Sequence, residues 1–543
     1  MRSLLKIKEI PMQEDFSLEE FDSHLVATME EPEAETARAD SETPFRIALM
    51  GDWSGRANRG LSASTGELAA WRPLLIDRDN LDRVLAKLGA RLHLPLSGDG
   101  NLSLTIQFNS LEDFHPDRIF ERVEMFELLR RTRARLSNPK TFDAAAEEVR
   151  SWANVKESDA QATTDAQETA SAEQPTDASA VDYSEGSLLD QMLAEAQGER
   201  TAPQPQRPVR QLSPDINALV QEAVRPYLVP GNEAEQESLI AAVDEAVAKE
   251  MSAILHHADF QALESAWRAL DFLVSRLETG TDLKLYLLDI SREELAADIL
   301  SNEQVDSSAL YKLLVESTVG TPGGIPWAVV VGNYRFDFTD AEFLQKISLV
   351  AQEAGAPFIA EASAHVIGCD SLARTPDPED WRATAEDEPS KAWRDLKRIP
   401  SASYLGLALP RFLLRLPYGQ ETEPTEEFDF EEMPPDAPPL HDWYLWANPA
   451  FAVVYLLAHA FTESGWDMRP GQVQEIEGLP LHIYTQDGES RIKPCAETLM
   501  TTRSAERIIN EGIMPLISMK DTDAIRLGMF QSLNGKRLAG RWG

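Results

Sequence analysis

Cysteine is nearly absent from the sequence. Cys369 and Cys495 are the two cysteines among 543 residues. Two thiols exclude a disulfide framework and are too few to form a zinc site by themselves. This usage is typical of proteins that work in a reducing compartment.

Basic residues and long apolar runs are also scarce. The 51 lysines and arginines face 91 aspartates and glutamates, so the formal net charge is −40. This balance argues against direct binding to nucleic acid, which needs clustered basic side chains. No run approaches the length of a membrane span, and the first residues, MRSLLKIKEIPMQEDF, are too charged for a secretory leader. We expect a soluble, cytoplasmic protein without membrane insertion.

Catalytic motifs are missing as well. The sequence has no GxSxG, no Walker lysine and no CxxC. His256 and His257 are adjacent on a predicted helix, where neighbours do not share a face, so we interpret them as a structural or surface pair. Cys369 follows His365 by four residues and could be a nucleophile, but a buried structural cysteine is favoured. We predict no enzyme activity, no catalytic or metal-binding residue and no cofactor.

The length exceeds what one hydrophobic core supports, so at least two domains are expected. Composition divides the chain into four regions. Residues 1–43 form an acidic lead-in with few apolar residues, and 44–153 form a first folded domain. Residues 154–229 form a flexible acidic linker, and 230–543 form the second, larger domain.

A short amphipathic stretch interrupts the linker. SLLDQMLAEAQ, residues 187–197, offers Ser187 as N-cap and an apolar stripe of Leu188, Leu189, Met192 and Leu193. Isolated helices of this length are marginal in water, so the stripe is expected to bind a partner. Docking on the chain's own folded domain is the alternative.

Strand and helix patterns alternate in both folded regions, which predicts a mixed α/β fold with sheets flanked by helices. Residues 44–50, 103–108, 284–290 and 327–332 are predicted as strands, and 80–92, 118–136 and 441–466 as helices. A pair of helices covers 237–277 with a break near His257. The order strand, helix, strand between residues 284 and 332 favours a parallel crossover.

The stretch GTPGGIPWAVVVGNY, residues 320–334, contains glycines beside an apolar run. A phosphate-binding loop follows a strand and opens a helix. Here Gly320, Gly323 and Gly324 precede the strand, and no Gly-Lys-Ser/Thr is present. We therefore interpret the glycines as a turn that enters a buried strand, with Trp327 serving packing.

Two arginines, Arg411 and Arg415, lie four residues apart in PRFLLRLPYG, which could be helical or extended. Arginines in this arrangement could bind a phosphate or carboxylate ligand. In so acidic a chain, internal ion pairs or contacts between subunits are the simpler interpretation.

Several motifs, in order, resemble the contractile sheath proteins of bacterial type VI secretion. Six segments resemble the large subunit (TssC or VipB, EvpB family): LHHADFQALESAWRALDFLV, GTPGGIPWAVVVGNYRF, APFIAEAS, LPRFLLRLPYG, YLWANPAFAV and GIMPLISMKDTDAI. They include Trp267 and Trp446. Three further segments, PFRIALMGDWSGR, LLIDRDNLDRVLAKL and LTIQFNSLEDFHPDRI, resemble the small subunit (TssB or VipA). The resemblance implies both subunits fused, small one first, as two sheath-type lobes.

The resemblance implies a structural protein whose partners are other sheath protomers, the inner tube protein Hcp, baseplate components and the recycling ATPase ClpV. SLLDQMLAEAQ is similar to the helix that ClpV recognises. The family's large subunit normally continues past the segment matching IRLGMFQSLNGKRL, and its small subunit has an N-terminal strand without a match before Pro44. These departures make a non-polymerising accessory or regulatory protein the first alternative. An anion-binding enzyme that uses Arg411 and Arg415 is the second.

Overall fold

The computed structural model describes residues 39–95, 103–154, 214–227, 236–382, 387–434 and 437–542. The chain divides into two compact units, one formed by Met1–Val123 with Ala248–Gly543 and the other by Glu124–Val247. The predicted helix at 187–197, with Leu188, Leu189, Met192 and Leu193, lies outside the described residues. So does most of the predicted lead-in at 1–43.

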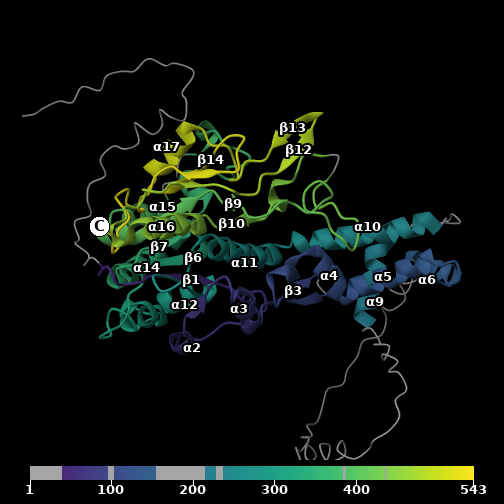
Figure 1. The fold of residues 1–543 in the computed structure, drawn as a ribbon, viewed down its shortest axis with the longest axis horizontal. Coiled ribbons are helices and arrows are strands. Elements are labelled where there is room, and N and C mark those ends of the chain that lie inside the picture. The colour runs from purple at the N-terminus through teal and green to yellow at the C-terminus, as the bar shows by residue number, and fades with distance from the viewer. Residues whose placement is uncertain are drawn as a thin grey trace, which may run out of the picture. The chain divides into compact units, whose positions relative to one another are not determined.

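A large mixed sheet forms the centre of the larger unit (Figure 1). Its strands, in spatial order, are β11 (Glu475–Ile476), β15 (Ile525–Leu527), β14 (Met514–Ser518), β8 (Leu405–Leu409), β7 (Phe358–Ala362), β6 (Val329–Phe336), β1 (Phe45–Gly51), β5 (Leu283–Asp289) and β2 (Leu74–Ile76). Neighbouring strands from β14 to β5 run parallel, whereas β15, β11 and β2 add antiparallel edges. The predicted mixed α/β class is confirmed.

Strand β1 lies between β5 and β6, far from them in sequence. Ile47 is paired with Leu285 on one side and with Val329 on the other. The run FRIALMG is apolar on both faces and almost wholly buried, as expected for an interior strand of a parallel sheet. The crossover predicted between residues 284 and 332 is parallel, but β1 separates its two strands. A strand from the predicted first domain thus belongs to the sheet of the second.

Helices cover both faces of this sheet. On one face α14 (Ala341–Ala354) buries Leu344, Ile347 and Val350 in the same core as Val330 and Leu407. On the other face α16 (Ala450–Ser464) packs across β6, β7 and β8, and the Phe461 ring lies 4.7 Å from that of Phe45. Other α-helices in the described part of the larger unit are α2 (Thr65–Ala70), α3 (Leu81–Leu88), α4 (Pro116–Arg122), α11 (Ala258–Arg276), α12 (Arg292–Ser301), α13 (Ala309–Tyr311), α15 (Glu388–Leu396) and α17 (Thr502–Asn510).

Among the described residues, the larger unit also contains three small two-stranded sheets: β3 (Arg91–Pro95) with β4 (Ser103–Gln107), β9 (Phe412–Leu413) with β10 (Trp446–Ala447), and β12 (Ile483–Gln486) with β13 (Glu489–Ile492). The helix predicted over 441–466 is therefore wrong in its first part. Proline cannot continue a helix from its interior, so α16 begins after Pro449, where the Asn448 side chain accepts a hydrogen bond from the Ala450 amide.

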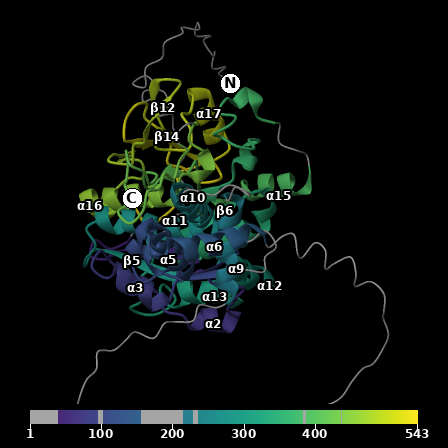
Figure 2. The same cartoon turned by 90° about the vertical axis from the view of Figure 1, so that its right-hand side faces the viewer.

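The smaller unit is helical. Figure 2 shows α5 (Glu124–Ser137), α6 (Phe142–Asn154) and α9 (Pro214–Val224) side by side, and α10 (Gln236–Leu255) begins in this unit and continues into the larger one. The helix predicted over 118–136 is divided by extended Val123 into α4 and α5. Helix α9 lies in the range predicted as linker and buries Val220 and Val224. Helices α6 and α9 contact each other within this unit.

Along the described parts of the chain, every helix is too short or too polar to cross a membrane.

Candidate functional site

Arg415 lies at the centre of a buried ion network. Its Nε and Nη2 donate hydrogen bonds to Glu264 of α11 at 3.0 and 3.4 Å. Its Nη1 and Nη2 donate to Glu432 at 2.7 and 3.1 Å, and Nη1 also reaches the Leu416 carbonyl at 3.0 Å. All five N–H groups of the guanidinium are therefore satisfied, and none is left for an external ligand.

The network extends to residues on either side of Arg415. Arg268 donates to Glu264 at 2.7 Å and to the Tyr418 hydroxyl at 3.0 Å. Glu432 accepts from the Tyr418 amide at 2.7 Å and makes a 3.2 Å hydrogen bond with His256, whose ring stacks on Trp443. Two carboxylates thus face two guanidiniums, and the group joins α11, the loop that follows β9 and His256, which directly follows α10.

The acid strength of Glu432 reflects these partners. Burial by itself would raise the pKa of this fully buried carboxyl, but the Arg415 charge and the hydrogen bonds from His256 and Arg415 lower the pKa to about 2. Glu432 is therefore a carboxylate at neutral pH. The predicted structural role of His256 is supported by these contacts, and His257 caps α11 by accepting from the Asp259 amide.

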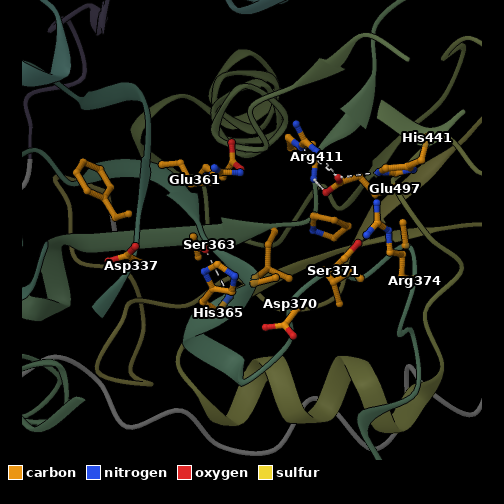
Figure 3. A pocket seen from close by; sticks show the side chains of 18 of the residues that line it. Asp337, Glu361, Ser363, His365, Asp370, Ser371, Arg374, Arg411, His441 and Glu497 are labelled. Carbon is orange, nitrogen blue, oxygen red and sulfur yellow. Dashed lines mark hydrogen bonds and ion pairs between the residues drawn. The ribbon is translucent and has the colours of Figure 1, made fainter. Parts of the chain in front are cut away.

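Arg411 forms a second, separate ion pair, with Glu497 (Figure 3). Its Nε and Nη2 donate to Glu497 Oε1 at 3.1 and 2.6 Å, and its backbone amide donates to Oε2 at 3.1 Å. The spacing of Arg411 and Arg415 is extended rather than helical, because β9 separates them. Both arginines have internal acidic partners, which favours the ion-pair interpretation over an anion-binding enzyme at these two side chains.

His441 and Lys493 continue the Arg411 cluster. The Lys493 ammonium lies 3.1 Å from His441 Nδ1, and an ammonium can only donate, so Nδ1 accepts and Nε2 carries the proton. That Nε2 lies 3.2 Å from Glu497 Oε1 and donates to it. Burial would raise the pKa of Glu497, but the His441 hydrogen bond and the Arg411 charge lower it to about 2.

A polar cleft of about 540 Å³ opens beside Arg411, at the carboxyl ends of β6, β7 and β8 (Figure 3). Its wall includes Arg335 of β6, Glu361 of β7, Arg411 and Glu497. The carboxyl edge of a parallel sheet is where open α/β folds commonly bind ligands. Burial raises the pKa of Glu361 to about 7, against the lowering effect of Arg411 and Arg335.

The predicted glycine turn precedes β6. Gly323 has a positive φ of 76°, and a Cβ placed on Gly324 would lie 2.1 Å from the Thr318 carbonyl oxygen. Close backbone approach therefore requires glycine at 324. At Gly320 a Cβ would lie 3.0 Å from Glu316 Cα, so space is tight there too. The glycines thus precede a strand and do not open a helix.

The tryptophans of the sheath-like motifs, Trp267, Trp327 and Trp446, are packed in the larger unit. Trp327 is buried with Arg46 over its ring at 4.0 Å. Trp267 donates to the Trp53 carbonyl at 2.9 Å, and the two indoles meet edge to face at 5.8 Å. Trp446 of β10 stacks on His441 at 5.0 Å. These side chains hold elements together, and none of the three lines the Figure 3 cleft.

Both cysteines are buried. Cys369 and Cys495 are buried free thiols whose pKa values are raised by burial, that of Cys495 to about 11. Cys369 contacts the Thr375 side chain at 3.4 Å. Within the described ranges, no cluster of three or more histidine, cysteine or acidic side chains is arranged to hold a metal ion.

Sequence reasoning missed the acidic partners Glu264, Glu432 and Glu497, and it missed Glu361. The first three carry no local signal, since their arginines are distant in the chain. Glu361 had one. It is the lone charge in the apolar strand FIAEA, and a charge there requires either a partner or a polar cleft.

Comparison with known proteins places both parts of the chain. The family described as "EvpB/VC_A0108, tail sheath N-terminal domain" (VipB) matches residues 237–534, more than half of the chain. The family described as "Type VI secretion system, VipA, VC_A0107 or Hcp2" matches residues 26–154. The VipA-like range contains β1, and the VipB-like range contains its neighbours β5 and β6.

Two curated proteins of Pseudomonas aeruginosa are similar to the chain. The type VI secretion system sheath protein TssC1 is 36% identical over 318 residues, which cover 57% of this chain and 64% of TssC1. Sheath protein TssB1 is 33% identical over 105 residues, which cover 19% of this chain and 59% of TssB1. The chain therefore spans less than two thirds of either relative. It belongs to the EvpB/VC_A0108 tail sheath family, a family of structural sheath proteins, and carries a VipA-like region ahead of the sheath domain.

Proposed function

We propose that the chain is a structural subunit of a type VI secretion contractile sheath, with the small and large subunits fused. The observation that carries the proposal is the position of β1, a strand of the VipA-like range that lies between β5 and β6 of the VipB-like range. An interior strand is hydrogen-bonded on both sides. Such mixing supports a single protomer built from both regions, whose boundaries at residues 44–153 and 230–543 remain part of the proposal.

The mechanism we propose is mechanical. Protomers would pack with different free energies in an extended and a contracted lattice, and that difference would drive contraction around an Hcp inner tube. Force transmission requires a stiff protomer, and the buried Arg415 network supplies stiffness because it joins α11 to the loop after β9. The protein would act in the cytoplasm with other protomers and baseplate components, without enzymatic chemistry.

Electron microscopy of the purified full-length chain tests the proposal. We expect tubes, either from the chain alone or after addition of separate sheath subunits from the same cell. A particle that stays monomeric and never enters a tube would contradict the proposal. A chain that decorates tubes at low stoichiometry, without building them, would support an accessory protein instead.

The proposed recognition by ClpV rests on the predicted helix at 187–197. Leu189→Asp with Leu193→Asp places charge on the predicted apolar stripe, and we expect binding to ClpV to be lost while the folded units stay intact. Ala194→Asp is the matched control, because position 194 falls on the opposite side of the predicted helix. Unchanged affinity of the double variant, measured by fluorescence anisotropy, would exclude this segment as the recognition site.

A further inference from the structure

Glu361 and Arg335 are neighbours in the sheet whose side chains form no ion pair with each other. They lie opposite each other in the register of β7 and β6, directly after an irregularity in the pairing of the two strands. Glu361 is 9% exposed, and along the described parts of the chain its carboxyl forms neither a hydrogen bond nor an ion pair. The Arg335 guanidinium is exposed and, within the same ranges, also lacks an acidic partner.

Two cavities have both Arg335 and Glu361 in their walls. The Figure 3 cleft, of about 540 Å³, and an adjacent cavity of about 460 Å³ share Arg335, Glu361, Arg411 and Asp442 in their walls. The second cavity extends toward Ser265 of α11 and Trp446. A small molecule or an extended side chain therefore has room to reach the Glu361 carboxyl.

The groups around Glu361 carry both signs of charge. The β6 strand contributes Arg335, and Arg411 contributes a guanidinium whose Nη1, among the described residues, has no hydrogen bond. Glu497 is engaged by Arg411 and His441, and exposed Asp442 lies 4.0 Å from Arg374. The cleft wall also carries Asp337, Asp340 and Asp370, of which Asp340 is paired with Arg292, Asp370 with Arg382, and Asp337 accepts hydrogen bonds from Thr339. Beside Glu361, the Arg335 guanidinium and Nη1 of Arg411 are therefore donors without an acceptor among the described residues.

We propose that this cleft binds a carboxylate group, which accepts hydrogen bonds from Arg335 and from the Glu361 carboxyl, with Arg411 alongside. The carboxylate belongs either to a free small acid or to an acidic side chain of a second copy of this chain. This site is independent of the proposed sheath function.

Two physical arguments favour a carboxylate over an ammonium group. An ammonium beside Glu361 would lie near the Arg335 guanidinium, which has no acidic partner along the described parts of the chain, and would be repelled by it. A carboxylate would be attracted by Arg335, and Glu361 can take up one proton and become the donor. Because burial raises the pKa of Glu361 to about 7, that uptake costs little near neutral pH.

Isothermal titration calorimetry of the full-length protein with succinate tests the site. Binding requires the protonated carboxyl, so the affinity should fall about tenfold between pH 6 and pH 8, on either side of a pKa of about 7. Titration in buffers of different ionisation enthalpy should show proton uptake at pH 7. Succinamide has nearly the same shape without charge and should not bind.

Variants separate this chemistry from the alternatives. Glu361→Gln keeps a donor at the same place, so succinate should bind at pH 8 about as tightly as wild type binds at pH 6. Arg335→Gln, at an exposed position where folding is unaffected, should weaken binding about tenfold or more, the range of one charge-assisted hydrogen bond. Arg503→Gln, exposed on α17 and outside both cavities, is the matched control and should bind as wild type.

Sedimentation at pH 6 distinguishes the two sources. Self-association of the wild type that succinate competes away, and that Arg335→Gln lacks, would assign the carboxylate to a second copy. Unchanged sedimentation with measurable succinate binding would assign it to a free acid. The proposal is overturned if succinate does not bind at pH 6, or if Glu361→Gln abolishes binding, since a glutamine amide keeps the donor that the proposal assigns to position 361.

Discussion

Replacing Glu432 by glutamine tests whether the Arg415 network stabilises the larger unit. The substitution preserves the size of the side chain and removes its charge. Arg415 keeps Glu264, at 3.0 Å, but loses the carboxylate that accepts at 2.7 and 3.1 Å. Glu432 is fully buried, so water cannot compensate for the missing charge.

The magnitude follows from linkage. A pKa that falls from 4.5 in the unfolded chain to about 2 in the folded protein stabilises the fold by about 3 kcal/mol at pH 7. Because the folded pKa is depressed, this stabilisation is complete above pH 4.5 and is lost as the pH falls through about 2. Glu432→Gln lacks it at every pH.

Urea unfolding followed by tryptophan fluorescence measures the effect. The variant should be about 3 kcal/mol less stable than the wild type at pH 7, and this difference should narrow to roughly half near pH 3. Measurements at pH 7 and pH 3 avoid the isoelectric point of about 4.6, where the solubility of the protein is lowest.

Glu427→Gln is the control, because Glu427 is exposed on the same loop and a surface change of this kind usually alters stability by less than about 0.5 kcal/mol. A loss below about 1 kcal/mol for Glu432→Gln at pH 7 would refute the reasoning, since a buried pair that loses one charge normally costs more.

Further predictions concern the turn, the thiols and one indole. Gly324→Ala should lower the melting temperature more than Gly323→Ala, because its Cβ would meet the Thr318 oxygen at 2.1 Å whereas open space surrounds position 323; the opposite order would contradict this. Cys369 and Cys495 should react slowly with a disulfide reagent at pH 8 and fully in urea, and rapid native labelling would show that they are accessible. Trp267→Phe should cost about 1–3 kcal/mol in urea unfolding, since the buried Trp53 carbonyl loses its donor at 2.9 Å; an unchanged midpoint would contradict it.

Local patterns predicted several elements of the larger unit. The apolar run FRIALMG became β1, the break near His257 separates α10 from α11, and the glycines before Trp327 form a turn. Predictions failed where a local feature competed with periodicity. Pro449 delayed the start of α16, extended Val123 divided one predicted helix, and α9 formed within a range whose overall composition is that of a linker.

The partners of these elements were not readable from local patterns. The sequence predicts that Arg415 has an acidic partner. It does not predict which one, because Glu264 lies 151 residues away and no local pattern links the two segments. The lone charge of Glu361 in a strand is a local feature of the sequence. That Arg335 and Arg411 lie beside Glu361 is not, because they come from β6 and from the segment after β8.

The sequence by itself determined the α/β class, the element types and, through ordered motifs, the sheath family, because hydrophobic periodicity, turn residues and motifs are local properties of the chain. Only the tertiary structure decided that β1 lies between β5 and β6 and that the acids face their arginines. Any apolar strand can pair with any other, and the choice depends on burial and register summed over segments more than 200 residues apart.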